Sequence, residues 1–208
     1  LDDSVWHYGF LVGFNIHDIR LANNGNAYVN PNHDVEYWYA DVPEYTPGFS
    51  VGVLGELKAN DWLSVRIIPT MHFGDKKVVL KEQRSGKFVE QYVKSTYLSV
   101  PFDLKISAAR FNNYRLYVVT GLAPTLDLTV KKGKELLVRK TDVMFEVGMG
   151  LDLYYPFFKM IPELKFCFGL NNILDRNRTD LKDASLLKYS DALDKAQNGM
   201  IVLTLYFE

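Results

Sequence analysis

Hydrophobic and polar residues alternate along most of this chain with a period of two. Between residues 6 and 16, every even position is bulky and apolar or aromatic, from Trp6 to Ile16, whereas the odd positions include His7, two glycines and Asn15. Successive side chains point to opposite faces of a strand, while a helix would mix both sets on one side. The segment therefore predicts a β-strand with one apolar and one polar face.

Seven further segments repeat this alternation, and together they predict an all-β chain. The expected strands cover residues 6–16, 48–58, 62–73, 94–106, 114–130, 142–155, 161–170 and 200–207. The connections run long, short, long, short, medium, short and long, as expected for antiparallel strands that follow one another around a sheet. We expect a single domain over residues 1–208.

The polar faces of these strands decide between two kinds of barrel. A soluble barrel keeps its apolar face inside, whereas a membrane barrel turns that face to lipid. Here the polar faces also carry the glycines, and the interior of an eight-stranded barrel is narrow. About ten residues per tilted strand span roughly 25 Å. We therefore predict an eight-stranded antiparallel up-and-down transmembrane β-barrel, and keep the soluble barrel as the alternative.

Connection lengths and aromatic positions suggest how this barrel lies in a bacterial outer membrane. Short turns are typical of the periplasmic side and long loops of the extracellular side, so both termini are expected to be periplasmic. Rings with one wet side suit the membrane interface. An interfacial aromatic belt is expected near the periplasmic edge at Trp6, Tyr8, Trp62, Tyr114, Tyr155, Phe157 and Phe207.

Two prolines interrupt the strand pattern. Pro69 and Pro124 lie on apolar faces within predicted strands. Proline cannot donate to a strand ladder. A bulge or a local pairing defect is expected at each position.

Charged residues on the polar faces predict a filled lumen. Acids and bases are balanced there, and so narrow an interior lets them pair and block it. The expected interior charge network consists of Glu56, Arg66, Asp103, Lys105, Arg115, Asp127, Glu146, Asp152, Glu163 and Lys165. The chain as a whole has a net charge of −1, which argues against nucleic acid as a partner.

The sequence offers little for catalysis or for a cofactor. His7, His17 and His72 share the lumen-facing parity, and His33 lies in the first long loop. His17, His72 and His33 are weak candidates for a metal site, which would need converging neutral imidazoles. The single cysteine, Cys167, excludes a disulfide framework and suits a small buried filler. We expect no enzyme activity and no cofactor, with a lipid-modifying enzyme as the remote alternative.

Several strands resemble PorT-type outer-membrane barrels of the Bacteroidota. The segments that carry the likeness are residues 6–15 (WHYGFLVGFN), 59–74, 95–105 (STYLSVPFDLK), 146–170 and 201–208. The resemblance covers nearly all predicted strands and little of the long loops. It implies a non-enzymatic subunit of a protein-export complex of the type IX secretion kind. Its implied partners are outer-membrane lipid and other outer-membrane or periplasmic proteins. The alternative is an accessory subunit of another machine, such as barrel assembly or uptake.

Overall fold

The computed structural model describes residues 4–23, 27–29, 35–44, 47–82, 88–129, 140–172 and 193–208. The described residues form twelve strands: β1 (Trp6–Asn23), β2 (Ala27–Val29), β3 (Val35–Glu44), β4 (Pro47–Lys58), β5 (Leu63–Ile67), β6 (Thr70–Glu82), β7 (Phe88–Ser99), β8 (Phe102–Ser107), β9 (Tyr114–Asp127), β10 (Thr141–Tyr154), β11 (Lys159–Gly169) and β12 (Leu193–Phe207). No helix in this part of the chain is long and apolar enough to cross a membrane.

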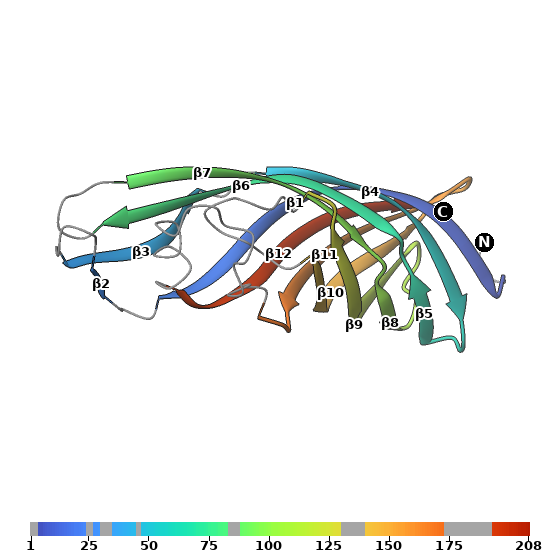
Figure 1. Cartoon of the computed structure of the whole chain (residues 1–208). Coiled ribbons are helices and arrows are strands. Elements are labelled where there is room, and N and C mark those ends of the chain that lie inside the picture. The colour runs from blue at the N-terminus through green and yellow to red at the C-terminus, as the bar shows by residue number, and fades with distance from the viewer. Residues whose placement is uncertain are drawn as a thin grey trace.

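Antiparallel pairing connects most of these strands into a ring. Following the pairs leads from β9 through β10, β11, β12, β1, β4, β5 and β8 back to β9. Two positions of this ring are shared by two segments each, since β6 continues β5 and β7 continues β8. The ring therefore has eight positions, as predicted, although the described residues contain twelve strand segments (Figure 1).

The chain ends and the short turns lie together at one end of the ring. The amide of Lys58 donates to the carbonyl of Val5, and Lys159 and Glu208 exchange two backbone hydrogen bonds. At the opposite end, Figure 1 shows β2, β3, β6 and β7 extending away from the other strands. The pairing of β6 with β7 continues outward to Lys81 and Phe88.

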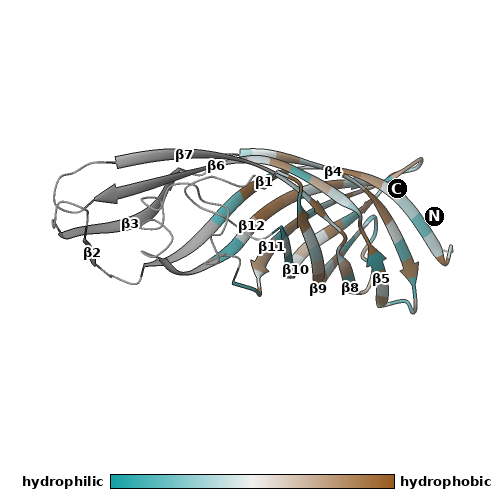
Figure 2. Cartoon of the chain, in the orientation of Figure 1, coloured by the Kyte–Doolittle hydropathy of each residue, from teal (hydrophilic) through white to brown (hydrophobic). Residues whose placement is uncertain are grey.

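The two faces of the wall have opposite polarity. Outward residues are large and apolar along the strands, as at Phe14, Val53 and Leu116, each more than half exposed. Inward residues include buried charges, and Arg66 and Asp103 have no exposed surface. Figure 2 shows the resulting alternation of hydrophobic and hydrophilic residues along the strands. This arrangement is the one that lipid around a barrel favours, and it opposes the soluble alternative.

The strands extend further than the alternation of polarity predicted. β1 ends at Asn23 rather than near residue 16, β12 begins at Leu193 rather than near 200, and β2 and β3 lie within the first predicted loop. The connection predicted between residues 73 and 94 is largely a β6–β7 hairpin. Ladder hydrogen bonds join backbone groups whatever the side chains are, so pairing continues where the alternation of apolar and polar residues stops.

Candidate functional site

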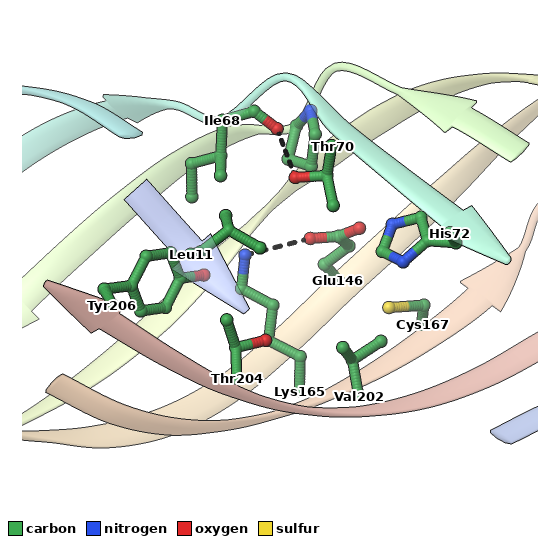
Figure 3. A pocket seen from close by; sticks show the side chains of 11 residues that line it. Leu11, Ile68, Thr70, His72, Glu146, Lys165, Cys167, Val202, Thr204 and Tyr206 are labelled. Carbon is green, nitrogen blue, oxygen red and sulfur yellow. Dashed lines mark hydrogen bonds and ion pairs between the residues drawn. The ribbon is translucent and has the colours of Figure 1, made fainter. Parts of the chain in front are cut away.

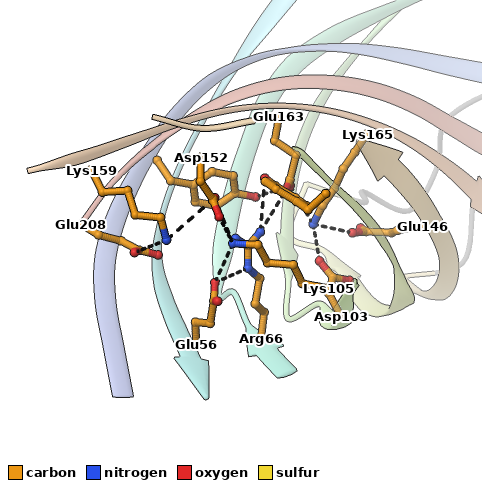
Figure 4. Close-up of polar contacts among 12 residues, drawn as sticks. Glu56, Arg66, Asp103, Lys105, Glu146, Asp152, Lys159, Glu163, Lys165 and Glu208 are labelled. Carbon is orange, nitrogen blue, oxygen red and sulfur yellow. Dashed lines mark hydrogen bonds and ion pairs between the residues drawn. The ribbon is translucent and has the colours of Figure 1, made fainter. Parts of the chain in front are cut away.

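Arg66 of β5 lies at the centre of a buried ion network that crosses the ring. Its Nε donates to Glu56 Oε2 at 2.7 Å, and its Nη1 donates to Glu163 Oε2 at 2.8 Å. Glu163 also accepts hydrogen bonds from the hydroxyls of Tyr117 and Tyr206. The guanidinium lies over both tyrosine rings, with its carbon 4.8 and 5.6 Å from their centroids. Four different strands, in addition to β5, supply these partners. Figure 4 shows Arg66 between Glu56 and Glu163.

Two lysines extend this network in opposite directions along the barrel. Lys105 Nζ donates to Asp152 at 2.8 Å and also reaches Glu56 at 3.5 Å. Lys165 Nζ pairs with Asp103, with Glu146 at 3.2 Å and with Glu163 at 3.5 Å. Near the chain ends, Lys159 joins Glu208 at 2.8 Å. Each buried lysine is thus matched by more than one carboxylate, which such a poorly solvated interior requires.

Eight of the ten predicted interior charges meet in this network, and two do not. Arg115 is partly exposed, and its guanidinium donates to the backbone carbonyls of Ala108 and Asp61 near the short turns. Arg115 is the second residue of β9, and alternation gives the face of a residue but not its depth along the barrel. Asp127 is buried at the other end of β9, where it accepts hydrogen bonds from the amide and hydroxyl of Thr129.

Four participants were not among the predicted residues. Lys159 and Glu208 lie at strand ends, outside the predicted strands 161–170 and 200–207, and Tyr117 and Tyr206 carry no charge and were not included in the predicted charge network. The tyrosines did carry a signal, since both occupy the polar parity of their strands. A buried tyrosine hydroxyl needs a hydrogen-bond partner, and here Glu163 supplies it for both.

Beyond the ion network, the lumen contains a neutral hydrogen-bonded group. Asn15 Nδ2 donates to Ser50 Oγ at 2.8 Å, and the His72 ring contacts Ser50 Oγ at 2.7 Å and Ser99 Oγ at 3.1 Å. All four side chains are buried, so the two serines are not presented to a substrate. The group therefore joins four neighbouring strand positions, β1, β4, β6 and β7, inside the lumen and offers no exposed nucleophile.

A small cavity separates the charged and neutral groups. Its volume of about 20 Å³ is the space of one or two water molecules. Figure 3 shows Lys165, Glu146, His72 and Cys167 around it. The sulfur of Cys167 thus lies inside the wall as a packing group, in a residue with only 2% of its surface exposed.

The weak metal candidates do not form a cluster in the described residues. His72 is bonded to two serines, and the His17 ring packs 5.1 Å from that of Tyr97. His33 lies outside the described residues. No group of three or more histidine, cysteine or acidic side chains that could hold a metal occurs in the part of the chain that is described.

The predicted aromatic belt residues lie at the end of the ring that carries the short turns. Trp62 follows the β4–β5 turn, Tyr114 follows the β8–β9 turn, and Tyr155 and Phe157 form the β10–β11 turn. Trp6 and Tyr8 stack at the start of β1, with ring centroids 6.4 Å apart. Phe207 is only partly exposed, because its ring stacks on Phe10 at 5.2 Å.

Comparison with known proteins agrees with this architecture. The family model described as outer membrane protein beta-barrel domain matches residues 2–175. The chain belongs to this family. It is therefore an outer-membrane β-barrel protein of bacteria. The likeness to PorT-type barrels in particular is narrower than this match and remains a proposal.

Two solved structures resemble the family member described here. The crystal structure of Neisserial surface protein A has a TM-score of 0.51 and 9% identity, covering 98% of each chain. Ail, the attachment invasion locus protein of Yersinia pestis, has a TM-score of 0.37 and 13% identity, covering 97% of each chain. At these identities the first likeness supports the fold alone. No curated protein matches the chain.

Proposed function

We propose that this protein is a non-enzymatic, non-conducting barrel that serves as a subunit of a larger outer-membrane complex. The observation that carries the proposal is the filled lumen. Arg66, Lys105 and Lys165 are each held by two or more groups from other strands, and the neighbouring cavity has room for one or two water molecules. A lumen of this kind leaves the outer wall and the protruding strands as the surfaces available for function.

The finer proposal is that this complex exports proteins in the manner of type IX secretion. Its support is the strand resemblance to PorT-type barrels in residues 95–105 and 146–170. The likeness falls on the ring, and the ring of a scaffold subunit is the part that must fit beside neighbours in the membrane. An accessory role in another outer-membrane machine, such as barrel assembly or uptake, is the second candidate. A lipid-modifying enzyme has less support, because Ser50 and His72 are buried.

The proposed orientation places the short turns and both chain ends in the periplasm. Its support is the group of aromatic rings at that end, including Trp62 and Phe157, each more than half exposed. The strands β6 and β7 would then protrude from the cell. A protease added to intact cells is expected to cut a site inserted at residue 85 and to spare a tag placed after Glu208. The opposite pattern would reverse the orientation.

Conductance in a planar bilayer tests the closed lumen. We expect the purified full chain to show no large stable channels. A variant that removes the central cation and one of its tyrosines, Arg66→Ala with Tyr117→Ala, is the positive control for an opened lumen. A large stable conductance of the unaltered protein would overturn the non-conducting proposal.

Co-purification tests the role in a complex. A tagged chain expressed at its native level and extracted in mild detergent is expected to bring down stoichiometric partners. Partners belonging to an export system, together with loss of secreted cargo on deletion of the gene, would support the finer proposal. Partners from another machine would favour the second candidate. A chain that purifies alone, with secretion unchanged on deletion, would refute both.

A further inference from the structure

Three prolines remove neighbouring hydrogen bonds from one side of the ring. The amide of Val53 donates to Pro69 O at 3.0 Å, that of Ile68 to Pro101 O at 3.1 Å, and that of Val100 to Pro124 O at 3.0 Å. In an antiparallel ladder such closely paired residues exchange two bonds. The return bond is impossible in all three pairs, because proline has no N–H.

These pairs form one continuous line across four ring positions. Pro69 follows Ile68 directly in the chain, and Pro101 follows Val100, so each pair touches the next. We call the pairs Val53–Pro69, Ile68–Pro101 and Val100–Pro124 the proline seam. The strand register is the same on both sides of the seam, since the residue pairs before it and after it follow one another without a shift. The seam is therefore a line of missing bonds and not a bulge.

Next to the seam, a side chain replaces one of the missing hydrogen bonds, and a small cavity lies against the wall. Thr70 Oγ1 donates to Ile68 O at 2.8 Å, which is the carbonyl that Pro101 cannot serve. Ile68, Thr70 and Pro101 also line the small internal cavity. The wall at this level thus lacks part of its ladder and part of its inner packing.

The seam also separates two structural parts. On the short-turn side β5 pairs with β8, and these two strands carry Arg66, Asp103 and Lys105 of the ion network. On the other side β6 pairs with β7 in the hairpin that extends beyond the ring, as Figure 1 shows. The strands are interrupted at the seam as well, since β5 ends at Ile67 and β6 begins at Thr70, while β7 ends at Ser99 and β8 begins at Phe102.

We propose that the proline seam is a hinge built into the wall, at which the β6–β7 hairpin bends relative to the charged part of the barrel. Missing ladder bonds lower the free energy of local opening, so motion is concentrated where bonds are absent together. The ion network on the other side keeps β5 and β8 fixed. Movement of the outer strands would then leave the lumen filled.

Amide exchange in a bilayer tests the hinge. In full-length protein in phosphocholine nanodiscs, the amides of Val53, Ile68 and Val100 should exchange about tenfold faster than those of Val119 and Gly148, which pair with each other in the β9–β10 ladder. Replacing the three prolines together (Pro69→Ala, Pro101→Ala, Pro124→Ala) restores the donors and should slow the seam amides by a similar factor. The three single substitutions give the same direction if the triple variant does not fold.

Pro162→Ala is the matched control. Pro162 pairs with Leu205 of β12, at a level where the β10–β11 ladder is interrupted, and lies away from the seam. Its replacement should leave the seam amides unchanged. Seam amides that exchange as slowly as the β9–β10 ladder in the unaltered protein would overturn the proposal, as would exchange that does not respond to the proline replacements.

Spin-label distances test the bending itself. In a Cys167→Ala background, labels at Phe73 and Phe145 span the seam, whereas labels at Ile67 and Phe145 do not. The first pair should give the broader distance distribution, and the triple proline replacement should narrow it. Equal widths for the two pairs would show that the hairpin and the barrel move as one body.

Discussion

The buried polar side chains are paired differently in the two halves of the lumen. On the short-turn side, Arg66, Lys105 and Lys165 are buried ions with several partners each. On the other side of the cavity, His72 and its serine partners form a group of neutral hydrogen bonds. Both halves fill the same narrow ring, but only the first depends on charge.

The difference determines where the barrel is rigid. A buried ion that loses its partner leaves an uncompensated charge, so charged clusters hold their strands in one arrangement. A neutral group that loses a partner forfeits a single hydrogen bond. The proline seam lies where these two regions meet, next to the cavity lined by Ile68 and Pro101. The charged half of the lumen is therefore expected to be the more rigid, and the neutral half the more adaptable.

The largest effect is expected from removing the central cation. Arg66→Met leaves Glu56 and Glu163 buried without their shared partner, and should lower the free energy of unfolding by about 3–5 kcal/mol. Urea titration in lipid vesicles, followed by tryptophan fluorescence, measures it. Adding Glu163→Gln should recover part of the loss by removing one uncompensated charge. A loss below about 1 kcal/mol would remove the distinction between the two halves.

The next effect concerns packing within the charged half. A Cβ at Gly150 would overlap the hydroxyl and ring of Tyr117. Gly150→Ala should therefore displace that ring from Arg66 and cost about 1–3 kcal/mol in the same titration. Gly55→Ala is the control, because a Cβ there meets only a carbonyl oxygen at 3.7 Å. Equal losses for the two variants would contradict the role of Gly150.

A smaller effect is expected in the neutral half. Ser99→Ala removes one partner of the His72 ring and should cost about 1 kcal/mol. This loss in the free energy of unfolding should not depend on the salt concentration, since no ion is involved. If Ser99→Ala proved as costly as Arg66→Met, the neutral group would be as important to the barrel as the ion network.

The smallest effect is expected at the tip of the β10–β11 turn. Phe157 is 92% exposed, so its ring has little contact with the rest of the barrel. Phe157→Ala should change the free energy of unfolding in detergent by less than about 0.5 kcal/mol. The same substitution should reduce stability more in bilayers than in detergent if the ring lies at the membrane interface. Identical changes in the two media would argue against its place in the aromatic belt.

Alternation predicted the wall well because the period of a strand is a local property. The face of each residue follows from its neighbours in the chain, so the apolar outside and the inward parity of Glu56, Arg66 and Glu163 could be predicted without any contact. Pro69 and Pro124 were likewise recognisable as sites of missing bonds. The position of Arg115 near the short turns could not be predicted, because parity does not report depth along the barrel axis.

The sequence by itself thus determined that this chain forms a membrane barrel with a charged, narrow interior. Only the tertiary structure decided which charges meet and where the wall is weak. Arg66 and Glu163 are 97 residues apart, and Pro101 joins the seam only because strand register places it opposite Ile68. Which face a residue occupies is fixed by its immediate neighbours, whereas partners across a closed ring depend on the register of every strand between them.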